Sequence, residues 1–337
     1  MSDFQGHRPA VAQDAVAFQP DGTTLVQNLP IPVPPSISPE AAAMLKRRNA
    51  MPAGADDLTA PVEIIREQMA PGRAMLEAEL LQRYPATVEN RRFAGVAVRI
   101  VTPAKRAPGS EHKLLINLHS GAFILGEGSI TEAIPIAALT GIRVLAIDYR
   151  LAPENPFPAA VEDMIAVYRE LLEEHESQHI ALYGSSAGAV LSAEAIVKMR
   201  QLSLPLPAAL GFFSGTADWA RPGDTESIFG LFGFTRRITP ILEAAQGYAP
   251  DADLENPVLS PIYADLKGFP ATLCMSGTRD FFLSGTANFH RALLRAGVDA
   301  RLVVFDAMPH VHWDDPSLPE TDEALNIQAG FLATHLK

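Results

Sequence analysis

The stretch that decides the fold is Ile180-Ala181-Leu182-Tyr183-Gly184-Ser185-Ser186-Ala187-Gly188. A short apolar run ends in Gly-Ser-Ser-Ala-Gly, and a helical pattern follows in which Val190, Ala193 and Val197 share one face. The pattern predicts a strand, a tight turn and a helix, with Ser186 at the turn. This is the context of a nucleophile elbow, in which small neighbours allow a serine to adopt a strained backbone conformation.

Composition and charge limit the class of protein. The chain has 337 residues, of which 47% are hydrophobic and 20% charged, so it can bury a large core. Its net charge of −12 argues against nucleic acid and anionic membranes as partners, because both bind basic surfaces. Cys274 is the only cysteine and lies in the apolar run 271–275. We therefore expect no internal disulfide and a core position for this thiol.

The start of the sequence does not resemble a secretory signal. Residues 1–20 contain Asp3 and Asp14 and no sustained apolar core. The sequence has no stretch of about 18 apolar residues, so we expect no membrane span. These features predict a cytoplasmic protein without a membrane partner.

Residues 1–86 are predicted to form an N-terminal arm and a helical cap. Residues 1 to about 38 form the arm, because residues 28–39 are rich in proline, which fixes φ and removes a backbone donor. The arm is either a disordered tail or a segment packed across the body. Its apolar side chains favour some packing.

Two helices are predicted between the arm and the first strand. Ser38 as N-cap and Pro39 at the first helical position predict a helix that ends at about Asn49. A second helical stretch covers about residues 61–84, with an interruption at Pro71-Gly72. Both helices precede the first strand and cannot connect strands of the sheet, so we interpret them as an added lid or cap.

From about Thr87 onward, short apolar strands alternate with helices. This alternation predicts one large α/β domain over residues 87–337, with a mostly parallel central sheet and helices on both faces. Residues 216–260 are irregular and rich in Gly, Pro and aromatic residues, which makes them a candidate additional cap or loop segment. The expected strands are 91–94, 97–102, 113–118, 143–147, 180–183, 209–213, 272–275 and 300–305, and the expected helices are 159–172, 187–201, 284–296 and 320–335.

A nucleophilic serine needs a base, an acid that orients the base, and donors for the resulting oxyanion. In this topology the acid and then the histidine follow the serine along the chain, at the carboxyl ends of strands. Asp280 follows the expected strand 272–275 and fits the acid. Either His310 or His312, which follow the expected strand 300–305, fits the base. Three other carboxylates lie too close to these histidines to come from a separate strand end: Asp306, Asp314 and Asp315.

The oxyanion donors are expected in the loop after an earlier strand. The apolar strand 113–118 leads into His119-Ser120-Gly121-Ala122-Phe123, where small residues let the backbone approach a substrate carbonyl. The alternative interpretation is an ordinary glycine turn. The helix after Ser186 contributes as well, because its first backbone N–H groups can face a developing negative charge.

Two other motifs match catalytic signatures but not their surroundings. His175-Glu176-Ser177-Gln178-His179 matches the HExxH zinc signature, which needs both histidines on one helix face. Here the motif is predicted at a helix end and turn, so we interpret it as a solvated turn and expect no metal. Ser110-Glu111-His112-Lys113 matches SxxK but opens a strand rather than a helix, which indicates a chance match.

Five segments are distinctive when taken together: HSGAF at 119–123, DYRLAPENPFPAA at 148–160, GSSAG at 184–188, SGTRDFFLS at 276–284 and MPHVH at 308–312. From about residue 88 to the C-terminus, the sequence resembles the bacterial hormone-sensitive-lipase-like carboxylesterases of the α/β-hydrolase fold. The resemblance implies an N-terminal helical cap over the site. It also implies Ser186 as nucleophile, His310 as base and Asp280 as acid. The implied oxyanion donors are the backbone N–H groups of Gly121, Ala122 and Ala187.

Two positions depart from the usual pattern of this family. The usual His-Gly-Gly-Gly is here His119-Ser120-Gly121-Ala122. The backbone donors survive, but the methyl group of Ala122 narrows the oxyanion hole and puts activity on bulky tertiary-alcohol esters in doubt. The usual Asp-Pro-Leu is here Asp280-Phe281-Phe282, which leaves the role of the acid intact.

The sequence therefore predicts a serine carboxylesterase that hydrolyses short- to medium-chain esters through an acyl-enzyme, without cofactor or metal. An amidase or a lactonase would use the same residues. A non-catalytic small-molecule receptor on this scaffold would be expected to lack a triad member, and all three are present. We expect a small-molecule ester as partner and, as the one candidate protein partner, a second copy of the chain in a homodimer.

The substrate pocket is expected to be apolar, as most ligand sites are. The apolar segment 227–234 is either a buried loop packed on the body or a wall around the acyl or alcohol group. The residues expected to line the pocket are Phe123, Ser185, Trp219, Phe229 and Phe232.

Overall fold

The computed structural model describes residues 16–20, 24–26, 31–50, 61–229 and 247–337. The chain divides into two compact units, Met1–Ser36 and Ile37–Lys337. In the first unit, strand β1 (Val16–Phe18) pairs antiparallel with β2 (Thr24–Val26). The second unit contains the central sheet and all elements described below.

In the described part of the chain, eight strands form the central sheet in the order β10-β9-β8-β7-β5-β6-β4-β3. Strands β5 to β10 pair in parallel, whereas β4 is antiparallel to both β3 and β6. Parallel neighbours need crossover connections, which the intervening helices provide. The predicted mostly parallel α/β fold is confirmed. The strands are β3 (Ala86–Phe93), β4 (Val96–Pro103), β5 (Leu114–Leu118), β6 (Arg143–Asp148), β7 (Ile180–Ser185), β8 (Ala209–Phe213), β9 (Ala271–Arg279) and β10 (Ala300–Pro309).

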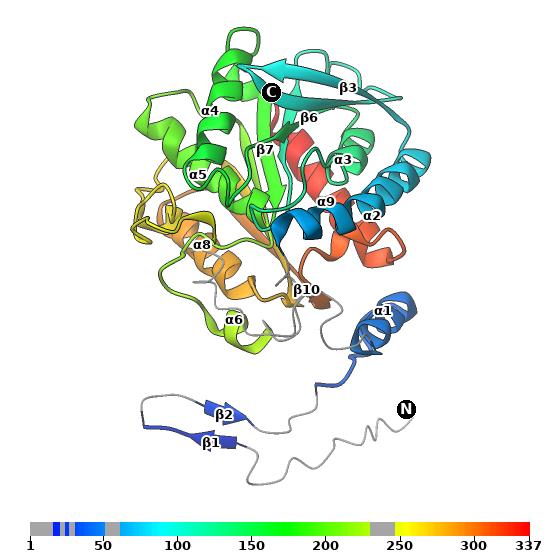
Figure 1. The fold of residues 1–337 in the computed structure, drawn as a ribbon, viewed down its shortest axis with the longest axis vertical. Helices are drawn as coiled ribbons and strands as arrows, with labels where there is room; N and C mark the ends of the chain where they lie inside the picture. Colours follow the sequence, from blue (N-terminus) through cyan, green and yellow to red (C-terminus); the bar gives the residue numbers. More distant parts are fainter. Residues whose placement is uncertain (1–15, 21–23, 27–30, 51–60, 230–246) are drawn as a thin grey trace. The chain divides into compact units, whose positions relative to one another are not determined.

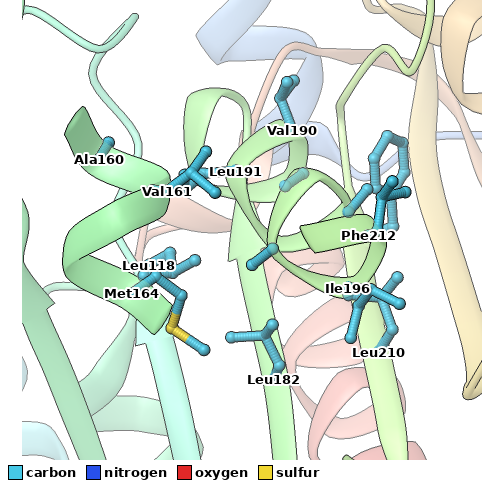
Figure 2. Packing of buried hydrophobic residues seen from close by; sticks show 14 of the residues in the cluster. Leu118, Ala160, Val161, Met164, Leu182, Val190, Leu191, Ile196, Leu210 and Phe212 are labelled. Atoms are coloured by element: carbon cyan, nitrogen blue, oxygen red, sulfur yellow. The ribbon is translucent and has the colours of Figure 1, made fainter. Parts of the chain in front are cut away.

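Helices cover both faces of this sheet (Figure 1). Side chains of α4, α5 and α8 pack on one face, where Met164 of α4 and Leu182 of β7 belong to the same buried cluster (Figure 2). Helices α3 and α9 pack on the other face with Tyr183. The neighbouring residues Leu182 and Tyr183 thus pack in the cores on opposite faces of the sheet, because side chains alternate along a strand. The helices are α3 (Ala133–Thr140), α4 (Ala159–Leu171), α5 (Ala187–Gln201), α6 (Asp224–Phe229), α8 (Leu283–Arg295) and α9 (Pro319–His335), with 3₁₀ turns at Ser177–His179, Pro261–Tyr263 and His312–Asp314.

Helix α1 (Pro39–Ala50) begins as the sequence predicts. The hydroxyl oxygen of Ser38 accepts the backbone N–H of Ala41 at 3.0 Å, which caps the helix. The same hydroxyl donates to Glu320 of α9 at 2.9 Å and ties α1 to the unit that holds the sheet. The division into compact units falls after Ser36, so α1 belongs to the unit that holds the sheet.

Helix α2 (Val62–Arg83) runs unbroken through Pro71, so the predicted interruption at Pro71-Gly72 is wrong. A proline inside a helix removes one N–H donor and crowds the preceding turn. Contacts on both sides of it hold α2 in place here, because Arg66 donates to the loop after β5 and Glu77 accepts from Arg99 of β4. Tertiary contacts thus override a local tendency to end the helix.

Among the described residues of the second unit, two α-helices were not predicted. α3 is apolar on every side and contains Pro135, so its sequence shows no amphipathic pattern. α6 lies within residues 216–260, the segment interpreted as irregular. The strands before Asp280 and His310 also extend further than predicted, and each ends directly before its residue.

Candidate active site

Ser186 occupies the turn between β7 and α5 with the strained backbone that the sequence predicts. Its φ of 54° and ψ of −120° fall outside the regions that residues with a side chain prefer. A side chain at Gly184 or Gly188 would clash with the carbonyl oxygen of Leu118 in β5. Only glycine fits at these two positions, which explains why the turn requires this sequence.

Three side chains from separate strand ends meet at this turn. Nε2 of His310 lies 2.9 Å from Oγ of Ser186, and Nδ1 of His310 lies 2.8 Å from Oδ1 of Asp280. When Nδ1–H donates to the carboxylate, Nε2 is the nitrogen that can accept the proton of the serine hydroxyl. The structure thus brings together the residues selected from the sequence as nucleophile, base and acid.

The carboxylate of Asp280 is completely buried and has further donors. The hydroxyl of Ser276 donates to Oδ2 at 2.7 Å, and the backbone N–H of Phe282 donates to Oδ1 at 2.9 Å. Burial alone would raise the pKa of Asp280, but the charge of His310 and the hydrogen bonds hold this pKa below its ordinary value. Asp280 is therefore charged at neutral pH and can stabilise an imidazolium at His310.

Two aromatic rings pack against the imidazole of His310. The ring centroid of Phe281 lies 4.2 Å from that of His310, and the centroid of Phe282 lies 5.6 Å away in an edge-on arrangement. These rings restrict the imidazole to the orientation that faces Ser186 and exclude water from its sides.

The alternatives left open by the sequence lie elsewhere. His312 is buried against Phe305 and Trp313, with ring centroids 4.8 and 4.9 Å away, and burial lowers its pKa to about 4. The structure therefore places His310, not His312, beside Ser186. The rival acids have other neighbours: Thr278 for Asp306, Glu132 for Asp314 and Ser317 for Asp315.

The loop after β5 turns sharply at three consecutive residues, with φ of 124° at Gly121, 53° at Ala122 and 64° at Phe123. A side chain at Gly121 would clash with the carbonyl group of Leu125, so this turn needs glycine. β5 pairs directly with β7, and this loop therefore leaves the sheet beside the turn at Ser186. Ala187 begins α5, whose first N–H groups have no partner within the helix. The three predicted oxyanion donors thus lie on two neighbouring turns.

Two predicted pocket residues belong to a buried aromatic cluster. Phe123 stacks on Tyr248 with ring centroids 3.6 Å apart, and Trp219 lies 6.3 Å from both rings. Phe123 and Trp219 are only 2% and 3% exposed. They therefore form a packed aromatic wall next to the loop after β5.

The other predicted pocket residues are not seen to line a pocket. Ser185 is buried, and its Oγ accepts a hydrogen bond from Nε1 of Trp313 at 3.0 Å. Its hydroxyl is used within the fold, so its predicted lining role needs correction. Phe232 and the side chain of Phe229 lie outside the described residues.

The two other motifs occupy the positions expected from the sequence. α4 ends at Leu171 and a separate 3₁₀ turn covers Ser177–His179, so His175 and His179 do not share a helix face. Across the described ranges, no group of His, Cys, Asp and Glu side chains is arranged to hold a metal ion. Ser110 lies in a turn before β5 and does not begin a helix. Cys274 is buried, as expected, and burial raises the pKa of its thiol.

Three side chains beside the site were not predicted. Ser276 binds Asp280, Arg66 binds the loop after β5, and Glu132 binds the backbone of Ser120. The signal that could have found Glu132 is its position as a lone carboxylate ahead of an apolar run. Serine and arginine at the other two positions have no comparable signal.

Residues 115–314, more than half of the chain, match the model of a family described as having the alpha/beta hydrolase fold. The chain is an α/β hydrolase. This α/β hydrolase is 35% identical to an acetyl-hydrolase of Streptomyces hygroscopicus over 69% of its own length and 78% of that protein. It is 31% identical to the carboxylic ester hydrolase LipN of Mycobacterium tuberculosis over 76% of its own length and 72% of LipN.

Solved esterase structures share the fold of this α/β hydrolase. Esterase E25 superposes with a TM-score of 0.84 and 34% identity, covering 93% of this chain and 98% of E25. An esterase from the bacterial hormone-sensitive lipase family gives a TM-score of 0.76 and 31% identity, covering 89% and 99% of the two chains. The predicted class, a hormone-sensitive-lipase-like carboxylic ester hydrolase, is confirmed. Among the helices described, none combines the length and apolar character required to cross a membrane.

Proposed function

We propose that this α/β hydrolase cleaves short- to medium-chain carboxylic esters through an acyl-enzyme formed on Ser186. Oγ of Ser186 attacks the ester carbonyl carbon while Nε2 of His310 takes the hydroxyl proton. The tetrahedral intermediate then collapses, and His310 returns the proton to the leaving alcohol. Water attacks the acyl-enzyme by the same route and releases the carboxylic acid.

The remaining site residues have supporting roles in this proposal. Asp280 fixes the tautomer of His310 and stabilises the imidazolium that forms when the proton is taken. The backbone N–H groups of Gly121, Ala122 and Ala187 bind the oxyanion of the tetrahedral intermediate. No step requires a metal or a cofactor.

The observation that carries the proposal is the pair of hydrogen bonds that joins Ser186, His310 and Asp280 at 2.9 and 2.8 Å. A nucleophile, a base and an orienting acid in this order are the requirements of serine esterase chemistry. The preference for small acyl groups is supported by the name of the Streptomyces hygroscopicus relative, an acetyl-hydrolase.

Hydrolysis of p-nitrophenyl acetate tests the proposal. Ser186→Ala is expected to reduce kcat by about 10⁴- to 10⁶-fold and to leave the circular dichroism spectrum unchanged, because the acyl-enzyme cannot form. Ser185→Ala is the matched control, since it removes the neighbouring hydroxyl, and should keep substantial activity. A folded Ser186→Ala protein that retains more than about a tenth of wild-type turnover would contradict the assignment.

The cytoplasmic location and the homodimer remain proposals. The acidic net charge, which disfavours binding to anionic membranes, supports the location. Cell fractionation would test the location, and light scattering on the purified protein would test the dimer.

A further inference from the structure

A buried carboxylate lies behind the loop that carries two of the proposed oxyanion donors. Glu132 is 7% exposed and immediately precedes α3. Its Oε1 accepts the backbone N–H of Ser120 at 2.8 Å. Ser120 precedes Gly121, so this hydrogen bond fixes the chain where the loop begins its turn.

Glu132 also connects this loop to β7, the strand that ends at the nucleophile. The hydroxyl of Tyr183 in β7 donates to the carbonyl oxygen of Glu132 at 3.3 Å. In the same strand, Oγ of Ser185 accepts Nε1–H of Trp313 at 3.0 Å, and Trp313 follows His310 by three residues. Glu132 therefore links the oxyanion loop to the strand of Ser186, and Ser185 links that strand to the segment after His310.

The carboxylate of Glu132 has a second partner in the sheet. Nδ2 of Asn117 in β5 donates to Oε2 at 3.5 Å. Burial raises the pKa of Glu132 to about 7, while the hydrogen bonds to its carboxylate act in the opposite direction. Burial and the charge of Glu132 also raise the pKa of Asp314 well above its ordinary value.

A buried carboxylate is not a favourable way to stabilise a core. Its desolvation is costly, and apolar residues of similar volume often give equal or greater stability. The carboxylate of Glu132 accepts from the loop of Gly121 and its carbonyl oxygen accepts from the strand of Ser186, the two elements whose relative position defines an oxyanion hole. Displacement of about 1 Å in such a site can cost about 100-fold in rate.

We propose that Glu132 is a positioning residue that fixes the oxyanion loop, through the N–H of Ser120, relative to the strand end that carries Ser186. Glu132 touches no reacting atom in this proposal. The inference rests on the proposed function, because an oxyanion hole has a role only if Ser186 is acylated. Its effect should appear in the transition state and not in the binding of the substrate.

Two substitutions of Glu132 separate positioning from general stability. Glu132→Ala leaves the N–H of Ser120 without its partner, and we expect kcat for p-nitrophenyl acetate to fall by about 10- to 100-fold with KM within about threefold. A trifluoromethyl ketone, which forms a tetrahedral adduct with the serine, should bind more weakly by about the same factor as kcat falls. Glu132→Gln keeps one acceptor oxygen and should retain kcat within about threefold of the wild type.

Asp163→Ala is the matched control. Asp163 is a buried carboxylate on α4 that also accepts a backbone N–H, that of Arg150 at 2.8 Å, and Arg150 belongs neither to the oxyanion loop nor to the strand of Ser186. We expect this variant to have a lower Tm and wild-type kcat and inhibitor affinity. If Glu132→Ala does not fold, Glu132→Asp, one methylene shorter, replaces it and should show the same loss of kcat.

The outcomes distinguish this role from the proposed function. An inactive wild-type protein, or a folded and active Ser186→Ala variant, would overturn the proposed function and with it the role of Glu132. An active wild type with unchanged kcat and inhibitor affinity in Glu132→Ala and Glu132→Asp would overturn the role of Glu132 alone. Equal losses of kcat in Glu132→Ala and Asp163→Ala would also overturn it, because they would indicate a general effect of stability.

Discussion

His312 and His310 are two residues apart but have different chemical environments. His310 contacts Asp280 and Ser186, whereas the ring of His312 is buried between Phe305 and Trp313. Burial lowers the pKa of His312 from 6.5 to about 4. Between these two values the unfolded chain binds a proton that the folded protein does not. The contribution of His312 to the free energy of unfolding is therefore complete above about pH 6.5 and is lost as the pH falls toward 4.

We expect His312→Phe to remove this pH dependence. The pKa shift corresponds to about 3 kcal/mol, so the free energy of unfolding of the wild type should fall relative to the variant by up to about this amount between pH 7 and pH 4. The quantity to compare is the difference in free energy of unfolding between the wild type and the variant. Buried acids with raised pKa values, such as Glu132, stabilise the fold as the pH falls in this range, and their effect cancels in that difference. Urea unfolding of both proteins at several pH values measures the difference. Parallel stability curves would show that His312 is not the group responsible.

Ala122 is exposed and has a φ of 53°, a conformation that favours glycine. Ala122→Gly removes a methyl group beside the proposed oxyanion hole and the backbone strain of about 1 kcal/mol. We expect kcat/KM for tert-butyl acetate to rise relative to ethyl acetate by about tenfold. The ratio of the two rates in wild type and variant is the measurement. An unchanged ratio would mean that the methyl group does not limit bulky alcohols.

At the scale of elements, α2 is joined to the loop that carries the proposed oxyanion donors. Nε of Arg66 donates to the carbonyl oxygen of Ile124 at 2.7 Å, and Nη2 donates to that of Ala152 at 2.9 Å. The guanidinium also pairs with Glu154 at 2.7 Å. The planar group with its several donors thus holds together α2, the loop after β5 and the segment after β6.

Arg66→Gln is expected to lower kcat by about 3- to 30-fold, because the loop after β5 loses its donor and can shift from its productive position. Arg83→Gln is the control on the same helix, since Arg83 pairs with Asp322 of α9 and donates to the carbonyl oxygen of Pro316, and neither partner belongs to the loop after β5. That variant should lower Tm and keep kcat. Steady-state kinetics and thermal unfolding give kcat and Tm for both variants. Equal losses of kcat would indicate that α2 acts only through overall stability.

The sequence was sufficient to predict the catalytic residues, because each of them has to lie directly after a strand of the sheet. Ser186, Asp280 and His310 each follow a strand, and this order along the chain is what the topology demands. Ser276 could not be predicted, because its partner is near it only after folding and no spacing marks it. Glu132 carries one sequence signal, its position as a lone carboxylate ahead of an apolar run, but that signal does not identify its partners. The continuous helix through Pro71 was missed for a related reason, since the contacts that maintain it come from distant segments.

At the scale of the whole molecule, the site lies at the carboxyl ends of the parallel strands. The proposed oxyanion loop follows β5, Ser186 follows the adjacent β7, and Asp280 and His310 follow β9 and β10. All leave the carboxyl ends of parallel strands, where open α/β sheets bind ligands. α6 is joined to the segment that carries Asp280, because the hydroxyl of Thr225 donates to the carbonyl oxygen of Phe281 at 2.8 Å.

The packed aromatic side chains next to the proposed oxyanion loop predict a limit on substrate length. Each buried methylene contributes about 0.8 kcal/mol, or roughly fourfold in kcat/KM, until the acyl chain meets a wall. Phe123, Tyr248 and Trp219 are at most 3% exposed and pack against one another, so a longer chain would have to displace packed rings. We expect kcat/KM for p-nitrophenyl esters from acetate to palmitate to be highest at or below about eight carbons and to fall beyond that length. A maximum at laurate or longer, or activation at an oil–water interface, would instead indicate an open site like that of a lipase.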